Sequence, residues 1–144
     1  FNKLWGKARC GYANSHHQDS DRFAWRRCTQ ENCPGYSDAD GPKIQLAAYS
    51  YDAGTPPYTG ENPELLKIFG NLFYPNINYY LGLAMDESGL STFTVSSADG
   101  VEIESISVQH SNLCSENFNE GSLQGFYFGG TCTAPIDVTV QFSS

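Results

Sequence analysis

The five cysteines of this 144-residue chain constrain its fold more than any other feature of the sequence. No two of them form a C-x-x-C pair, so the spacing does not support a zinc ribbon or a redox dithiol site. Lys is scarce while Tyr, Asn, Ser and Gly are plentiful, and the sequence opens at Phe1 without an initiator Met. We therefore expect a mature secreted, extracellular protein held together by structural disulfides.

An odd number of cysteines allows at most two bridges within the chain. Cys114 and Cys132 are the expected first pair, because they flank one segment and both lie beside strand-like runs. Cys10, Cys28 and Cys33 compete for the second bridge. A Cys10–Cys28 bridge, our working assignment, would staple the N-terminal region, whereas Cys28–Cys33 would close a tight loop. The remaining thiol is buried and inert, bonded outside the chain, or reactive.

Alternation of apolar and polar side chains predicts a mainly β fold. Strands are expected at residues 21–28, 43–52, 79–85, 90–96, 101–109, 123–128 and 136–142. Within the fifth of these strands, the apolar residues change parity, which predicts a bulge near Glu104 and Ser105. The 14% of aromatic residues and the 17% of charged ones argue against disorder.

One helix signal stands between the predicted strands. Asn62 suits the N-cap, Pro63 the first helical position and Gly70 the exit, so we expect a short helix over residues 63–69. The expected fold class is therefore α+β, mainly β, with an antiparallel sheet of five or six strands, one short helix and disulfide staples. The length fits a single domain over residues 1–144.

Charge is distributed unevenly along this chain, whose formal net charge is −8. Residues 1–43 contain seven basic and five acidic side chains, whereas residues 44–144 contain one basic and eleven acidic ones. We therefore distinguish a basic, cysteine-bearing head (1–42) from an acidic sheet body (43–144). The acidic total argues against a nucleic-acid partner. No apolar run approaches the roughly 20 residues that span a bilayer, so no membrane insertion is expected.

The most concentrated binding candidate consists of Arg22, Trp25, Arg26 and Arg27. Guanidinium groups around an indole allow cation–π stacking and bidentate contacts to carboxylates. These arginines either recognise a partner or pair with the acidic body of the protein itself. We expect at least half of a second, aromatic group to pack in the core: Phe73, Tyr74, Tyr79 and Tyr80.

Imidazole and carboxylate groups give a weaker signal. Residues 16–21 (His-His-Gln-Asp-Ser-Asp) lack the ligand spacing of a zinc site, so we expect a solvated loop. Residues 38–41 (Asp-Ala-Asp-Gly) resemble part of a calcium loop, but no later Glu closes it.

Glu102 and Glu104 are expected on one strand face, roughly 6.5–7 Å apart, a separation within the range of an inverting glycosidase pair. A hydrolase would need two of these groups to converge: His16, His17, His110, Glu102 and Glu104. We expect a solvent-facing strand instead, with no metal, no cofactor and no enzymatic activity.

Two short segments resemble known families of secreted proteins. The run Trp25-Arg26-Arg27-Cys28 resembles the Trp-Arg motif of the LARS family of avirulence effectors, which are sheet-plus-helix proteins with disulfides. That family usually has more cysteines. The tail from Tyr79 through Leu90 to Cys114 and Cys132 is similar to that of the Alternaria major-allergen family of secreted β-barrels, which also has an odd cysteine.

Together, these resemblances imply a small secreted effector of a plant-pathogenic fungus. Such a protein would bind a host protein or receptor and be recognised by plant immunity as a virulence or avirulence factor. Two other functions compete with this one. The first is a secreted hydrolase, RNase-like or glycan-cleaving, and the second is a carbohydrate-binding module that uses the tyrosines.

Overall fold

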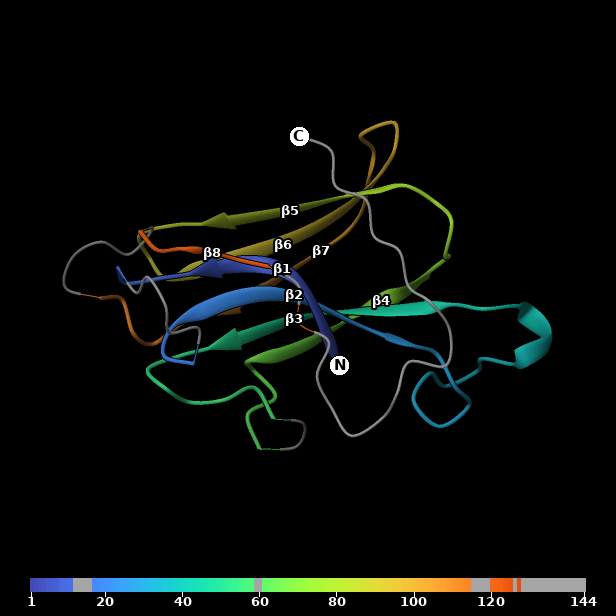
Figure 1. Cartoon of the computed structure of the whole chain (residues 1–144), viewed down its shortest axis with the longest axis horizontal. Helices are drawn as coiled ribbons and strands as arrows, with labels where there is room; N and C mark the ends of the chain where they lie inside the picture. Colours follow the sequence, from blue (N-terminus) through green and yellow to red (C-terminus); the bar gives the residue numbers. More distant parts are fainter. Residues whose placement is uncertain (12–16, 59–60, 115–119, 126, 128–144) are drawn as a thin grey trace.

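Two antiparallel sheets make up the part of the chain that the structure describes (Figure 1). The computed structural model describes residues 1–11, 17–58, 61–114, 120–125 and 127. A five-stranded sheet has the order β4-β3-β2-β1-β8, and a three-stranded sheet has the order β5-β6-β7. The strands are β1 Asn2–Ala8, β2 Ser20–Arg27, β3 Ile44–Tyr51, β4 Leu66–Phe73, β5 Tyr79–Met85, β6 Leu90–Ser97, β7 Glu102–Gln109 and β8 Leu123–Gln124.

The mainly β, antiparallel expectation is confirmed, but the described strands form two sheets, of five and of three strands, where one sheet of five or six was expected. The head does not stand apart from the body. Strands β1 and β2 of the head lie within the five-stranded sheet, beside β3 of the body. The predicted bounds of β2, β3, β5, β6 and β7 agree with the structure to within one residue. Strand β8 begins at residue 123, as expected for the strand at 123–128, but its described part ends at Gln124. The strand expected at 136–142 lies outside the described residues.

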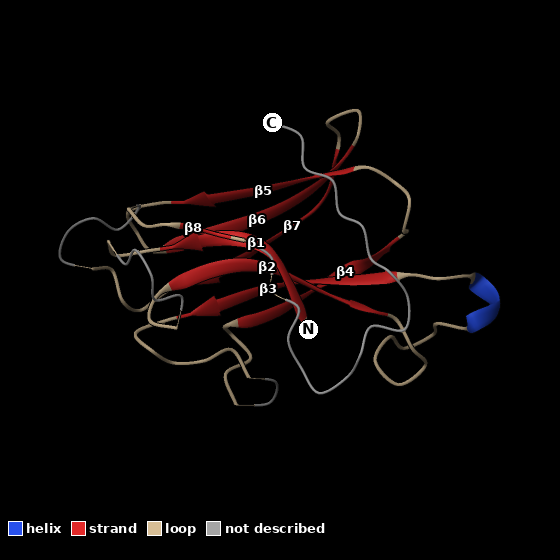
Figure 2. Ribbon diagram, in the orientation of Figure 1, coloured by secondary structure: helices blue, strands red, loops and turns tan. Residues whose placement is uncertain are grey.

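The helix expected at residues 63–69 is wrong, because strand β4 occupies most of this segment. In the β3–β4 register, Gln45 pairs with Leu72 and Ala47 with Ile68, so β4 carries two extra residues at this point. Phe69 and Phe73 are both buried, and a spacing of four residues puts two side chains on one face of a strand as well as of a helix, so this spacing does not distinguish the two. Among the described residues, the helical structure is one 3-10 turn, Asp38–Asp40 (Figure 2).

The predicted bulge in β7 exists, one residue earlier than expected. Val95 pairs with Glu104 and Ser96 with Glu102, so Ile103 is the extra residue. Glu102 and Glu104 therefore point to opposite faces of the sheet, and the expectation that they share a face is wrong.

The inner faces of the two sheets enclose one apolar core. Phe23 of β2 stacks on Phe69 of β4 with ring centroids 6.3 Å apart, and it meets Phe93 of β6 edge-on at 5.1 Å. Within this core, β1 contributes Leu4 and Trp5 next to Phe23. Among the described residues, no helix is long and apolar enough to cross a membrane.

Two disulfides staple this fold, and their pairing differs from the working assignment. Cys10 bonds Cys114, 104 residues away, instead of Cys28. Cys28 bonds Cys33, which was the alternative for the second bridge. The expected Cys114–Cys132 pair is therefore wrong, and Cys132 lies outside the described residues. The long bridge joins the end of β1 to the loop that follows β7.

Candidate functional site

The predicted Arg and Trp patch is divided between the two faces of β2. Arg22 and Arg26 lie on the outer face of the sheet, whereas Trp25 packs partly buried against the core on the inner face. Arg27 is exposed at the end of the strand. The four side chains therefore do not form one recognition surface.

The arginines of this group contact mainly neutral oxygens of the protein itself. Arg22 is only 4% exposed and donates a hydrogen bond to the carbonyl of Gly125. Arg26 donates to Gln45 Oε1 at 2.7 Å and to the carbonyl of Asn32 at 3.3 Å. Burial lowers the pKa of both Arg22 and Arg26. Their role here is to hold loops and strands together.

A different set of charged side chains converges inside the protein. We call this set the buried charge cluster, and none of its members is more than 7% exposed: Arg9, Asp19, Asp21, Asp52 and His110. The sequence patterns did not predict it.

Arg9 lies at the centre of the buried charge cluster. Its Nη2 donates to Asp19 Oδ1 at 3.1 Å, to Asp52 Oδ1 at 3.4 Å and to His110 Nδ1 at 2.8 Å. Its Nε lies 3.4 Å from Asp21 Oδ2. One guanidinium thus bridges three carboxylates and an imidazole, in the way its fork of donors allows.

His110 joins the two sheets through Asp21. A guanidinium only donates, so Nδ1 of His110 accepts from Arg9, and Nε2 carries the proton donated to Asp21 Oδ1 at 2.8 Å. Asp21 also accepts from Ser50 Oγ at 2.5 Å and from Ser91 Oγ at 2.7 Å. Since Ser50 belongs to β3 and Ser91 to β6, the Asp21 carboxylate holds both sheets at once.

Asp52 anchors the loop that follows β7. It accepts from the Ser111 amide at 2.9 Å, from the Ser111 hydroxyl, and from the Asn112 amide at 3.1 Å. Burial alone would raise the pKa of Asp52, but these hydrogen bonds outweigh it, so the pKa is lowered. The Cys10–Cys114 disulfide closes the same region covalently.

The geometry of the buried charge cluster suits a structural role. A hydrogen-bonded carboxylate–imidazole pair is a common acid–base unit, but it must reach a substrate. Here His110 and Asp21 are almost fully buried, and the Arg9 guanidinium occupies the centre of the carboxylates. Within the described residues, no group of three or more His, Cys, Asp or Glu side chains is arranged to hold a metal ion.

One signal could have indicated this cluster from the sequence. Asp21 shares the parity of Phe23 and Trp25 along β2, so a carboxylate is expected on the core face. A buried carboxylate requires a cationic or hydrogen-bonding partner. The identity of that partner depends on long-range pairing, since Arg9 and His110 are 101 residues apart.

The described candidates for hydrolysis do not share a pocket. His17 is exposed, with its ring 5.3 Å from that of Tyr51, and His110 belongs to the buried charge cluster. Glu104 accepts from the amides of Gly70 and Asn71 at 2.7 and 2.8 Å. Glu102 faces the opposite side of the sheet. His16 lies outside the described residues.

The second, aromatic candidate is also divided. Phe73 is buried, and Tyr79 packs against it with ring centroids 5.3 Å apart. Tyr74 and Tyr80 are exposed. As expected, half of this group belongs to the core.

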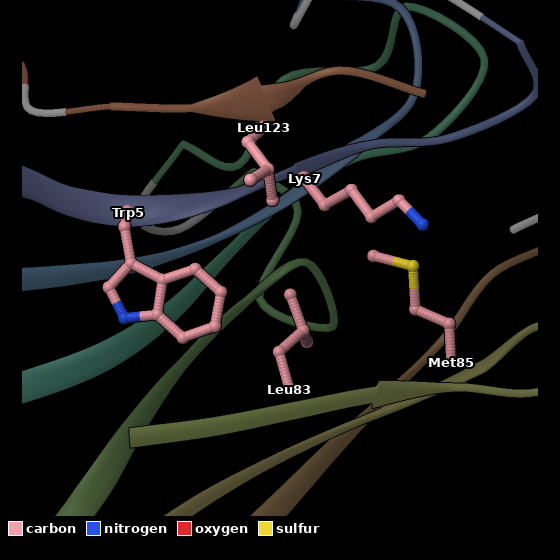
Figure 3. A pocket seen from close by; sticks show the side chains of 5 residues that line it. All are labelled: Trp5, Lys7, Leu83, Met85 and Leu123. Atoms are coloured by element: carbon pink, nitrogen blue, oxygen red, sulfur yellow. The ribbon is translucent and has the colours of Figure 1, made fainter. Parts of the chain in front are cut away.

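An apolar cleft lies where strand β5 faces β1 and β8 (Figure 3). Its volume is about 290 Å³. The lining side chains are Trp5, Lys7, Leu83, Met85 and Leu123. None of the predicted binding or catalytic residues lines it, so the sequence patterns did not predict this feature either.

Known proteins add no further information. No family model, curated protein or solved structure matches this chain. The resemblances to the LARS effectors and to the Alternaria allergen family remain predictions. What the molecule does is therefore inferred from its own residues.

Proposed function

We propose that this protein is a secreted, non-enzymatic effector-type protein that acts by binding a host component. The observation that carries the proposal is the placement of the ionisable groups. The described side chains best suited to acid–base chemistry, His110 and Asp21, are buried against Arg9 and bind together the two sheets. The described cleft is apolar and contains none of them. Binding needs such a surface, whereas hydrolysis needs a reachable acid or base.

The disulfides support the secreted part of this proposal. Two bridges in a chain of 144 residues are typical of proteins that fold in an oxidising compartment. Mass spectrometry of the intact protein with and without reductant measures the number of bridges. Two bridges agree with the proposal, and fully free thiols in protein purified from its native source contradict it.

Infiltration of leaves tests the effector activity. The purified, oxidised protein is infiltrated into leaves of a panel of plant genotypes, beside the same preparation after reduction, alkylation and unfolding. We expect a tissue response to the folded protein that differs between genotypes, and no response to the unfolded control. If folded protein elicits nothing in any genotype, the effector proposal fails.

One observation favours a second function, carbohydrate binding. The outer face of the three-stranded sheet carries the 58% exposed Tyr80. Beside it, hydroxyl pairs cross from β6 to β7, with Thr92 Oγ1 3.2 Å from Ser107 Oγ and Thr94 Oγ1 3.1 Å from Ser105 Oγ. An exposed ring next to hydroxyl groups suits a sugar. A glycan array tests this function: Tyr80→Ala should remove any signal, and an array without signals rejects it.

A further inference from the structure

The edges of the two sheets are not equally protected. An edge strand presents unpaired backbone N–H and C=O groups, which proteins usually protect with charges, proline, bulges or a covering element. Side chains connect the edges of β4 and β7: Glu104 accepts from two β4 amides, and Lys67 Nζ donates to the carbonyl of Ser107 at 2.6 Å. Strand β5 is the outermost strand of the three-stranded sheet in Figure 1, and among the described residues it pairs with β6 alone.

Strand β5 has none of the usual protection. Its sequence, YYLGLAM over Tyr79–Met85, contains neither a charged residue nor a proline. Its pairing with β6 runs through the whole strand without a shift of register, so no bulge turns the edge away. Just beyond the strand, the amide of Asp86 donates to the carbonyl of Leu90. Since bonded and free positions alternate in an antiparallel ladder, the odd-numbered residues of β5 point their backbone N–H and C=O groups away from β6. An apolar edge with free backbone groups favours a strand partner.

Gly82, in the middle of β5, is not required by the fold of a single copy. Its φ does not lie in the left-handed region. A methyl group in place of its hydrogen would lie 3.8 Å from the Thr94 side chain and 4.0 Å from the Thr94 carbonyl oxygen, which are ordinary contacts. A glycine inside a strand weakens it, and it often marks a bulge or a place where another backbone approaches closely. The ladder has no bulge at Gly82, so we infer a close approach.

We propose that β5 pairs with β5 of a second copy of this chain, antiparallel and with Gly82 on the twofold axis. In this register, Leu81 of each copy lies opposite Leu83 of the other, and Tyr79 lies opposite Met85. These are the positions with free backbone groups, so about eight hydrogen bonds form between the copies. The two three-stranded sheets then continue into one sheet across the axis. A twofold dimer requires a self-complementary surface, which a strand paired antiparallel with itself supplies.

The outer face of this pairing is complementary in the size of its side chains. Tyr80, Gly82 and Ala84 share this face, because they alternate along β5. The Tyr80 ring, 58% exposed in one copy, lies opposite Ala84 of the other copy and diagonal to its Gly82. The two glycines meet at a position without hydrogen bonds, where Cα atoms approach to about 4.5 Å. The Tyr80 rings cover the bare backbone there, as aromatic residues do beside strand glycines.

The charges near β5 also allow a second copy at this edge, although each copy has a formal net charge of −8. Continuing the register places Asp86 beside Asn78 and Glu87 beside Ile77 of the other copy. No two carboxylates therefore face each other between residues 77 and 87. The interface is one strand wide on each side, so we expect a weak, concentration-dependent dimer. This proposal does not depend on the effector proposal, because the purified protein suffices to test it.

Sedimentation velocity over a range of about 5 to 500 µM protein tests dimerisation. We expect monomer at the low end and a dimer with a Kd below about 100 µM. Gly82→Glu places two carboxylates opposite each other on the axis and should weaken the dimer at least about tenfold. Ser105→Glu is the matched control, because Ser105 lies in the same cross-strand row, beyond Thr94 and two strands from the axis. It adds the same charge and should change the Kd by less than about twofold.

A cysteine at position 82 tests the register. The two residues at this position lie about 4.5 Å apart between their Cα atoms in the proposed dimer, a separation that a disulfide spans. Gly82→Cys should therefore form a disulfide-linked dimer under air oxidation, measured by mass spectrometry without reductant. Ser105→Cys should give no more linked dimer than wild type, which has the same five native cysteines.

Near-ultraviolet circular dichroism verifies the fold of each variant, and the ordinary contacts around Gly82 indicate that one copy tolerates a side chain there. Three results would each overturn the proposal. The first is folded wild-type protein that is still monomeric at about 500 µM. The second is a folded Gly82→Glu protein that dimerises as tightly as wild type. The third is a Gly82→Cys protein that gives no more linked dimer than Ser105→Cys.

Discussion

The positive charge among the carboxylates of the buried charge cluster is the guanidinium of Arg9. Its guanidinium contacts Asp19, Asp21 and Asp52, which lie on segments brought together by folding. Buried carboxylates without a partner are costly. At the scale of the residue, the cationic side chain that matters most for the fold is therefore Arg9 rather than the arginines of the predicted patch.

Replacing Arg9 should be strongly destabilising. Arg9→Met removes the shared donor and leaves three carboxylates close together, so we expect the free energy of unfolding to fall by about 3–5 kcal/mol. Arg27→Met, which changes an exposed arginine, should stay within about 0.5 kcal/mol of wild type. Urea denaturation measures both values. Equal stabilities for the two variants would contradict the role assigned to Arg9.

The lowered pKa of Asp52 predicts how the stability of the protein changes in acid. Its pKa is lowered in the folded state, so its contribution to stability is complete above the unfolded pKa and is lost as the pH falls through the folded pKa. Asp52→Asn should therefore be less stable than wild type at neutral pH, and the difference should shrink below about pH 4. Urea denaturation at a series of pH values measures this difference. A difference that stays constant down to acid pH would contradict the prediction.

At the scale of the element, irregular strands explain both what the sequence predicted and what it missed. Clean alternation located β3 and β6, whereas β5 was predicted from a run that is apolar on both faces. In β1, a bulge sets Leu4 and Trp5 side by side opposite Phe23, so the alternation breaks and no strand was predicted. These bulges are fixed by contacts with distant strands, which local periodicity does not contain.

The helix signal before β4 is a local one. Asn62 and Pro63 suit the start of a helix and Gly70 its exit, but pairing with β3 makes this segment a strand. The amides of Gly70 and Asn71, freed from the ladder by the irregularity, donate to Glu104 of β7. The Glu104 carboxylate of the other sheet thus accepts hydrogen bonds from the two backbone amides that the irregular strand leaves without a strand partner.

Glu104 should therefore matter more than its neighbour Glu102. Burial opposes ionisation of Glu104, but the bonds from Asn71 and Gly70 prevail and lower its pKa. Glu104→Gln replaces a charged acceptor by a neutral one and should cost about 1 kcal/mol, a modest value because the group is partly exposed. Glu102→Gln is the matched control and should be nearly neutral. Thermal unfolding of the two variants distinguishes them, and an equal loss in both would refute the capping role.

At the scale of the whole molecule, a single region connects distant parts of the chain. The buried charge cluster contacts the end of β1, strands β2, β3 and β6, and the loop after β7. The Cys10–Cys114 bridge fixes the same region. The sequence predicted the presence of disulfides, but not this pairing, because connectivity depends on which segments the fold brings together.

The two disulfides should differ in their contribution to stability. In the chain-entropy description, a bridge stabilises more when the loop it closes is longer. Cys10 and Cys114 are 104 residues apart, whereas Cys28 and Cys33 are five apart. Replacing the first pair by Ser should cost about 4–5 kcal/mol, and replacing the second about 2 kcal/mol. Guanidinium denaturation measures both losses, and the reverse order would contradict the prediction.

We propose that the acid–base groups of this protein serve its fold and that the protein acts by binding. His110→Gln tests it most directly, because a Gln side chain retains one donor for Asp21 and one acceptor for Arg9 but cannot titrate. The decisive measurement is the leaf response to folded His110→Gln protein, infiltrated at the same concentration as wild type into a responding genotype. We predict an undiminished response. Loss of the response in a variant that is still folded would mean that the imidazole itself carries the activity, and would contradict the claim.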